Sequence, residues 1–166
     1  MKRFTTIYDS PLGKLKLQCS DEHVNAVLFC DEGVDELQND KHSLLQQCIA
    51  QLDEYFAGKR KDFGLPLQQD GTAFQQKVWD LLLQIPFGKT ISYQQLANQY
   101  GDLKAIRAVA AANGKTNLAI IVPCHRVIGS NHSLTGYAGG LWRKKWLLEH
   151  EAKLHAGVEQ LGLTFG

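Results

Sequence analysis

A helix-turn-helix pattern runs through residues 92–114, which read SYQQLANQYGDLKAIRAVAAANG. Ser92 and Gln95 form the Ser-x-x-Gln pattern of a capping box, which predicts a helix that begins there and ends near Gly101. A second helix is predicted over about residues 104–113, because no helix breaker occurs before Gly114. Two short helices joined by a tight turn indicate a helix-turn-helix whose second helix lies in the recognition position.

The predicted second helix is unusually rich in alanine. Ala105 and Ala108 lie beside Arg107, and three more alanines follow. One interpretation is a buried helix that packs closely against its neighbours. The alternative is a helix that faces a nucleic acid, because an unpaired arginine is costly to bury and its guanidinium can reach phosphates or fill a vacated place in a base stack.

The first part of the chain predicts a small sheet and one helix. Residues 4–8, 14–19 and 24–29 are strand-like, with strict alternation of hydrophobic and polar residues over 14–19 and turn residues between the three segments, which is typical of antiparallel strands. Residues 43–56 have apolar positions close to helical spacing and are followed by Gly58. One helix packed against a three-stranded sheet is therefore expected.

A connector near residue 70 divides the chain into two expected domains. Residues 1–70 form an N-terminal α/β support domain, and residues 71–166 form a mostly helical C-terminal domain. A Thr72-x-x-Gln75 capping box opens the second domain, and a helix with one apolar and one basic side is predicted from Leu141 to about His150. The expected fold class is therefore α+β.

Charge is distributed unevenly between these two parts. Residues 1–70 carry 8 Lys and Arg against 12 Asp and Glu, a net charge of −4, whereas residues 71–166 carry 10 against 5, a net charge of +5. A basic domain on an acidic support is what a nucleic-acid-binding protein would show. Two halves that attract each other would show the same asymmetry.

The sequence predicts a globular cytoplasmic protein without a metal site. No run approaches the roughly 18 apolar residues of a membrane helix, and the first residues contain no apolar signal segment. The four cysteines, without a secretory signal, are expected to be reduced thiols. Neither a Cys-x-x-Cys motif nor a zinc-finger spacing of Cys and His occurs.

The candidate reactive group is Cys124, within Ile121-Val122-Pro123-Cys124-His125-Arg126-Val127. A cysteine becomes nucleophilic when a base or a cationic environment populates its thiolate. His125 is adjacent, and Glu151 could orient the imidazole in a Cys-His-carboxylate relay. A hydrolase would use the same three groups, although no oxyanion-hole motif is recognisable. A buried structural cysteine beside an ordinary histidine is the other interpretation.

The chain resembles the O6-alkylguanine-DNA alkyltransferase family in several motifs that follow the family's order and spacing. Over residues 72–151 these are Ile91-Ser92-Tyr93, Arg107-Ala108-Val109, Ile121-Val122-Pro123-Cys124-His125-Arg126-Val127, Tyr137-Ala138-Gly139-Gly140 and Trp146-Leu147-Leu148-Glu149-His150-Glu151. In the first domain they are Asp9-Ser10-Pro11-Leu12-Gly13 and Leu52-Asp53-Glu54-Tyr55-Phe56-Ala57-Gly58. Pro-Cys-His-Arg is short by itself, but the conjunction of motifs is specific.

The resemblance implies direct DNA repair. The alkyl group on guanine O6 would move irreversibly to Cys124, so that each protein molecule reacts once, as a methylated-DNA–protein-cysteine methyltransferase. His125 would deprotonate the thiol through a water, and Glu151 would complete the relay. Tyr93 would contact the flipped base and help to protonate the departing guanine. Arg107 would fill the gap left in the DNA.

The same resemblance implies how the base and the DNA are held. The backbone around Val127 would meet the guanine amine, the loop at Tyr137 and Ala138 would close over O6, and Lys144 would support the pocket. The partner would be double-stranded DNA that contains alkylated guanine, and possible activity on O4-alkylthymine is left open. The second helix would enter the minor groove with little sequence preference, because small side chains permit close approach. A monomer without a cofactor is expected.

Three departures from the family pattern stand out. Many members have Asn-Pro where this chain has Thr116-Asn117, and that Asn ties the active-site turn to the recognition helix. Thr116 could supply a weaker bond, or Asn117 or Asn113 could take its place. Ala138 replaces a serine of some relatives, which is harmless if only its backbone amide is used. The zinc site of human-type members is incomplete, so no metal is expected.

Two alternatives remain in different functional classes. A lesion-binding protein of the alkyltransferase-like kind would flip the base without reacting, but those relatives replace the cysteine that this chain keeps as Cys124. A cysteine hydrolase would turn over many substrate molecules, whereas an alkyltransferase stops after one.

Overall fold

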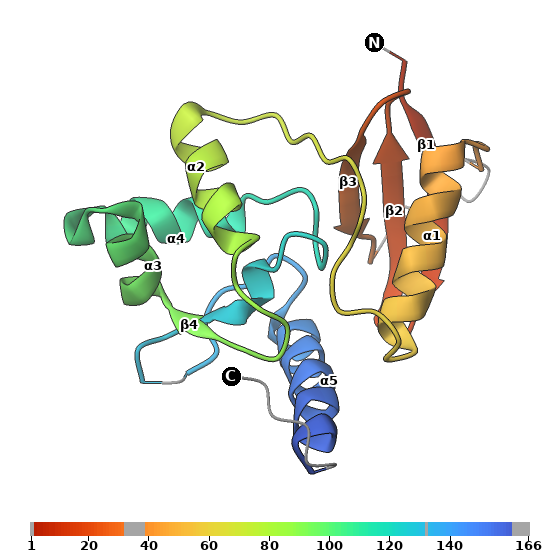
Figure 1. Ribbon diagram of the computed structural model, residues 1–166. Coiled ribbons are helices and arrows are strands. Elements are labelled where there is room, and N and C mark those ends of the chain that lie inside the picture. The colour runs from red at the N-terminus through yellow and green to blue at the C-terminus, as the bar shows by residue number, and fades with distance from the viewer. Residues whose placement is uncertain (1, 32–38, 132, 161–166) are drawn as a thin grey trace. The chain divides into compact units, whose positions relative to one another are not determined.

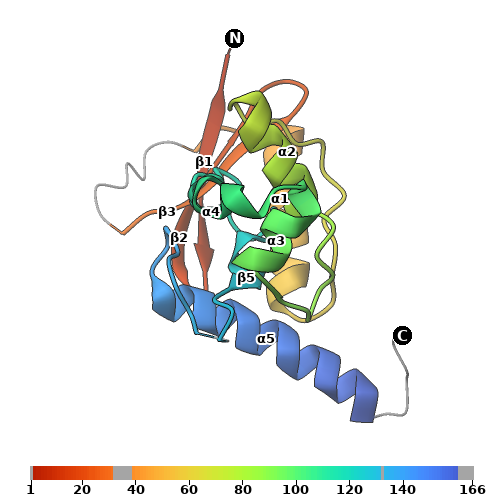
Figure 2. The same cartoon turned by 90° about the vertical axis from the view of Figure 1, so that its left-hand side faces the viewer.

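The computed structural model describes residues 2–31, 39–131 and 133–160, with side chains up to residue 155. His132 lies outside the described residues. The chain forms two compact units (Figures 1 and 2). Unit 1 comprises residues 1–70 together with 117–121, and unit 2 comprises residues 71–116 together with 122–166. The α+β fold class is confirmed.

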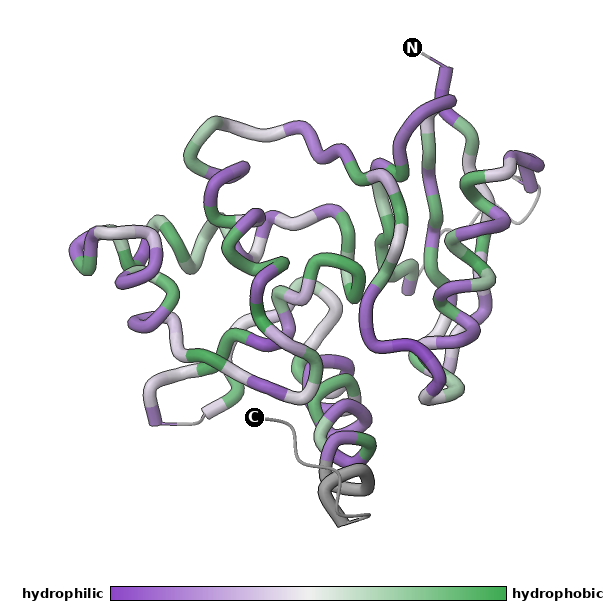
Figure 3. Tube along the Cα trace, in the orientation of Figure 1, coloured by the Kyte–Doolittle hydropathy of each residue, from purple (hydrophilic) through white to green (hydrophobic). Residues whose placement is uncertain are grey.

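Unit 1 is a three-stranded antiparallel sheet with one helix on it. The strands are β1 (Phe4–Ser10), β2 (Gly13–Cys19) and β3 (Val24–Phe29), in the order β1-β2-β3. Figure 3 shows hydrophobic and hydrophilic residues alternating along β2, as a strand with one buried face requires. Helix α1 (Ser43–Phe56) packs against the sheet, as expected from its apolar spacing.

A short segment from much later in the chain completes unit 1. The backbone amide of Val27 in β3 donates to the carbonyl of Asn117 at 2.7 Å, and the carbonyl of Val27 accepts from the amide of Ala119 at 3.0 Å. Ile120 then adopts a φ of 72°. This left-handed conformation is a strained one for a β-branched residue. The chain is therefore fixed and bent just before it reaches Val122.

Unit 2 is mostly helical, as expected. Its elements are α2 (Ala73–Leu82), β4 (Ile91–Ser92), α3 (Tyr93–Tyr100), a 3-10 turn (Leu103–Ala105), α4 (Ile106–Gly114), a second 3-10 turn (Cys124–Arg126), β5 (Val127–Ile128) and α5 (Leu141–Gln160). Both predicted capping boxes are formed, at Thr72 with Gln75 and at Ser92 with Gln95. Gly101 ends α3 with a φ of 108°.

Three details of unit 2 differ from the sequence-based expectation. The second helix begins with a 3-10 turn, because Asp102 caps that turn through the amide of Lys104 at 2.9 Å. The last helix continues to Gln160 instead of ending near His150; residues 151–156 contain no glycine or proline, and the helix runs on through Gly157. The two-residue parallel pair of β4 and β5 was not predicted, because such short strands leave no periodic pattern.

The helix-turn-helix is held by a buried contact. The indole Nε1 of Trp79 in α2 donates to the carbonyl of Ala112 in α4 at 2.9 Å. Val109 and Ala112 are buried, whereas Arg107 and Ala108 are exposed. Helix α4 therefore buries one face and leaves the face with Arg107 open. Among the residues that the structure describes, no helix is both long and apolar enough to cross a membrane.

Candidate active site

The thiol of Cys124 sits on a buried 3-10 turn. Cys124 is 4% exposed, and its backbone amide donates to the carbonyl of Val122 at 2.7 Å. The segment that leads into the turn is hydrophobic (Figure 3), and Pro123 precedes the turn with φ −80°. Burial raises the pKa of the Cys124 thiol to about 12, while the positive charge of Lys144 opposes that shift. The resting group is therefore a thiol.

His125 and Glu151 form a buried pair in unit 2, as the relay requires. The His125 Nε2 lies 2.7 Å from the Glu151 Oε2, and the two side chains are 0% and 1% exposed. Burial lowers the pKa of His125, although Glu151 acts in the opposite direction. A carboxylate accepts hydrogen bonds, so the neutral ring carries its proton on Nε2. The Nδ1 atom then has a lone pair, and no partner for it is found among the described residues.

Arg126 is the member of this cluster that the sequence did not reveal. Its Nε donates to the Glu151 Oε1 at 2.7 Å, its Nη2 donates to Oε2 at 3.1 Å, and its Nη1 donates to the carbonyl of Ile85 at 2.7 Å. Burial alone would raise the pKa of Glu151, but His125 and Arg126 outweigh it and hold that pKa well below its usual range. Glu151 thus stays ionised while it orients His125. The only sequence signal was the position of Arg126 beside the histidine.

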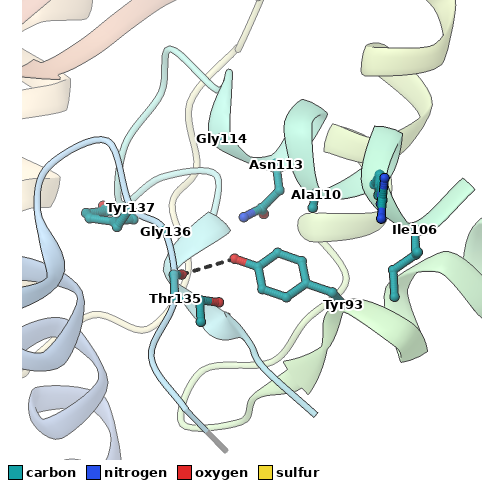
Figure 4. A pocket seen from close by; sticks show the side chains of 9 residues that line it. Tyr93, Ile106, Ala110, Asn113, Gly114, Thr135, Gly136 and Tyr137 are labelled. Atoms are coloured by element: carbon teal, nitrogen blue, oxygen red, sulfur yellow. Dashed lines mark hydrogen bonds between the residues drawn. The ribbon is translucent and has the colours of Figure 1, made fainter.

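A cavity of about 510 Å³ lies in unit 2 (Figure 4). Its volume is within the roughly 300–1,000 Å³ typical of ligand pockets. The lining comes from α3, α4 and the loop before α5, and consists of Tyr93, Ile106, Arg107, Ala110, Asn113, Gly114, Thr135, Gly136 and Tyr137. Three of the predicted site residues, Tyr93, Arg107 and Tyr137, therefore line one cavity. The exposed Ala138 follows Tyr137 in the same loop.

Lys144 connects α5 to this cavity. Its side chain is buried, and its Nζ donates to the carbonyl of Thr135 at 2.8 Å and lies 5.7 Å from the centre of the Tyr93 ring. The Tyr93 hydroxyl donates to the same carbonyl at 3.2 Å (Figure 4). Burial lowers the pKa of Lys144 to about 8, so the ammonium form predominates at neutral pH. Burial also raises the pKa of Tyr93, which therefore keeps its proton.

The link between the recognition helix and the active-site turn involves Asn113. Its Nδ2 donates to the backbone carbonyl of Cys124 at 3.4 Å. Asn117 is exposed, and its backbone amide donates to Gln69 in unit 1 at 2.6 Å. Thr116 is half-buried at the end of the unit 2 segment. Of the three side chains considered for this link, Asn113 contacts the backbone of the turn.

The remaining predicted residues lie on α4 and beside it. Arg107 and Ala108 are exposed on the helix, and Ala105 is half-buried in the 3-10 turn before it. Val127 is buried in β5 and pairs with Ile91 of β4. This pairing joins the turn that carries Cys124 to the start of the helix that carries Tyr93.

The sequence matches one family along nearly its whole described length. Residues 4–69 match the domain described as "6-O-methylguanine DNA methyltransferase, ribonuclease-like domain", and residues 73–153 match its DNA binding domain. The constitutive methylated-DNA–protein-cysteine methyltransferase of Bacillus subtilis is 45% identical over 146 residues, which cover 84% of this chain and 88% of the relative. The chain belongs to the 6-O-methylguanine DNA methyltransferase family.

Solved structures of this family agree with the fold. The O6-methylguanine methyltransferase of Mycobacterium tuberculosis is 40% identical, with a TM-score of 0.83, over 92% of this chain and 94% of the other. The same organism's OGT in complex with DNA is 41% identical, also with a TM-score of 0.83, over 91% and 94%. Within the described residues no group of His, Cys, Asp and Glu is arranged to hold a metal ion.

Proposed function

We propose that this protein repairs DNA by moving an alkyl group from O6 of guanine to Cys124, once per protein molecule. The observation that carries the proposal is the buried Cys124 turn in unit 2. The turn also carries His125, which pairs with Glu151, and its Cys124 carbonyl accepts a hydrogen bond from Asn113 of the cavity lining. Membership of the methyltransferase family supports the same reaction.

The reaction needs a base for the thiol and an acid for the leaving group. His125 Nδ1 takes the Cys124 proton through a water, and Glu151 stabilises the imidazolium that forms. The thiolate attacks the alkyl carbon, the bond between that carbon and O6 breaks, and its electron pair passes to the guanine. Tyr93 helps to protonate the departing base. The product is a thioether, from which no thiolate is regenerated, so turnover stops at one.

The rest of the cavity holds the flipped base. The Val127 backbone meets the guanine amine, the loop at Tyr137 and Ala138 closes over O6, and Lys144 fixes that loop through its bond to Thr135. The positive charge of Lys144 also favours the Cys124 thiolate. Thr116 and Asn117 are proposed to shape the approach to the turn.

Helix α4 is proposed to enter the minor groove of double-stranded DNA. Its exposed face presents Arg107 with Ala108, and small side chains allow the backbone to approach the groove without reading base edges. Ala105 contributes from the preceding turn. Arg107 fills the place that the flipped base leaves, which offsets part of the unstacking cost of a few kcal/mol. We propose that the protein acts as a monomer in the cytoplasm.

The proposal is tested with duplex DNA that contains O6-methylguanine. We expect the peptide around Cys124 to gain the mass of one methylene group, and Cys124→Ala to abolish the gain. Cys30→Ser is the matched control, because Cys30 lies outside unit 2 and is only partly buried. A protein that binds this DNA and gains no mass would be a lesion-binding protein. Repeated turnover of an ester or amide would indicate a hydrolase.

A further inference from the structure

Asn113 has one amide atom that the fold leaves without a partner. The residue is 3% exposed and lines the cavity, where its side chain extends toward the Tyr93 hydroxyl (Figure 4). Its Nδ2 donates to the Cys124 carbonyl at 3.4 Å, whereas its buried Oδ1 has no hydrogen-bond partner in the part of the chain that the structure describes. Buried polar atoms are nearly always paired in native proteins. We therefore expect the ligand to supply the hydrogen-bond donor for this oxygen.

The orientation of the amide is set by its neighbour. A backbone carbonyl such as that of Cys124 can only accept a hydrogen bond, so it must face the NH₂ of Asn113 and not its oxygen. Exchanging the two amide atoms would place two acceptors against each other. The lone pairs of Oδ1 are thus available to a hydrogen-bond donor in the cavity. The Tyr93 hydroxyl does not supply this donor, because it already donates its hydrogen to the carbonyl of Thr135 at 3.2 Å.

The chemistry of the substrate supplies one matching donor. O6-alkylguanine has acceptors at N1, N3, N7 and O6, and its only N–H donors are those of the exocyclic 2-amine. O4-alkylthymine has no N–H group at all. A buried acceptor in the base cavity therefore distinguishes the two lesions, because a site built to hydrogen-bond an N–H group rejects an analogue that lacks it.

We infer that the Asn113 Oδ1 accepts a hydrogen bond from the 2-amine of the flipped guanine, so that Asn113 is a specificity-determining residue. The inference rests on the proposed function. Asn113 then has two roles, since its Nδ2 holds the active-site turn at the Cys124 carbonyl while its Oδ1 selects the base. Because the 2-amine has two hydrogens, one can bond to Asn113 and the other to the backbone near Val127.

The test compares two DNA duplexes that differ only in the 2-amine, one with O6-methylguanine and one with O6-methylhypoxanthine. Single-turnover transfer rates are measured for the wild type, Asn113→Leu and Asn113→Asp. Both variants lose the NH₂ that faces Cys124, but only aspartate keeps an acceptor. We expect a preference for O6-methylguanine of about a hundredfold in the wild type, because the 2-amine makes two hydrogen bonds and each, at ordinary strength, corresponds to about tenfold. The preference should persist in Asn113→Asp and fall to about tenfold in Asn113→Leu, where only the bond to the backbone near Val127 remains.

If the ratio of the transfer rates from the two duplexes is the same in Asn113→Leu as in the wild type, the inference is overturned. Because each ratio is internal to one variant, a general loss of folding or rate cancels from it. If a variant transfers from neither duplex, the dissociation constants of the two duplexes are compared in the Cys124→Ala background, with and without Asn113→Leu, and the same loss of preference is expected. A wild type that methylates Cys124 from neither duplex would refute the proposed function itself, which is a distinguishable outcome.

Discussion

Lys144 and Lys145 are sequence neighbours in opposite environments. Lys144 is buried against the Thr135 carbonyl, whereas the side chain of Lys145 is 66% exposed near Glu149. Lys144→Met should slow transfer from O6-methylguanine by roughly 10- to 100-fold. The substitution removes the positive charge that lowers the pKa of the Cys124 thiol, and it also removes the hydrogen bond that holds the cavity loop at Thr135. Lys145→Met should change the rate by less than about twofold. Equal effects of the two substitutions would contradict this account of the thiol.

The Glu151 carboxylate holds two buried partners, so its loss should be costly. Glu151→Gln leaves the Arg126 guanidinium buried without a counter-charge, which typically costs about 3–5 kcal/mol of unfolding free energy. Urea denaturation measures this cost, with the exposed Glu149→Gln as the control.

A double substitution separates the structural role of this pair from its chemical role. Glu151→Leu combined with Arg126→Met removes both charges, so it should recover much of the stability lost in Glu151→Gln. Transfer should remain slow, because His125 has lost its orienting carboxylate. If the double variant recovers the transfer rate as well as the stability, the carboxylate of Glu151 has only a structural role.

At the level of single residues the sequence singled out candidate reactive groups more readily than the residues that hold them. Cys124, His125 and Glu151 were candidates because their residue types have few chemical uses in that combination, and the structure places His125 and Glu151 in contact. The bidentate contacts of Arg126 and the amide of Asn113 depend on where α5 and α4 bring their ends, and residue types do not encode those distances. Thr116, Asn117 and Asn113 were all considered for the link to the active-site turn, and the structure shows Asn113 bonded to the Cys124 carbonyl.

Helix α4 presents a single exposed arginine beside small side chains, which makes a prediction about DNA structure. Arg107→Ala should slow transfer from duplex DNA by at least about tenfold, because nothing then fills the gap beside the flipped base. With single-stranded DNA, which has no stacked helix to fill, the same substitution should have little effect. Lys104→Ala removes an equal exposed charge on the preceding turn and serves as the control. An equal loss with both kinds of DNA would show that Arg107 contributes only charge.

The elements themselves were largely predictable where local chemistry sets them. Both capping boxes, the helix at Ser43–Phe56 and the hairpin of β1 and β2 follow from short-range patterns. The segment before the active site was not predictable. Its bonds to Val27 join residues about 90 positions apart in sequence, and the left-handed Ile120 runs against the preference of a β-branched residue. The tertiary contacts with Val27 therefore determine the backbone conformation of this segment, against the local conformational preference of Ile120.

For the whole molecule, the buried Glu151–His125 pair predicts loss of stability in acid. The folded state lowers the pKa of His125 below its ordinary 6.5 and that of Glu151 below its ordinary 4.5, so the unfolded chain binds more protons as the pH falls through these values. The free energy of unfolding should therefore decrease from about pH 6.5 downward and more steeply below pH 4.5. Urea denaturation across this range measures it, and Glu151→Gln should flatten the lower part of the curve. A stability that stays constant to pH 4 would refute the assignment.

The most direct test of the central claim is a count of methyl groups transferred per protein molecule. Purified protein is incubated with a large excess of duplex DNA that contains O6-methylguanine, and the product is followed by mass spectrometry of the intact protein and of its peptides. The relay and the thioether product predict a plateau at one methyl group, located on Cys124, with restored guanine in equal amount. Continued formation of guanine beyond one per protein, or methylation at another residue, would contradict a single irreversible transfer to this thiol.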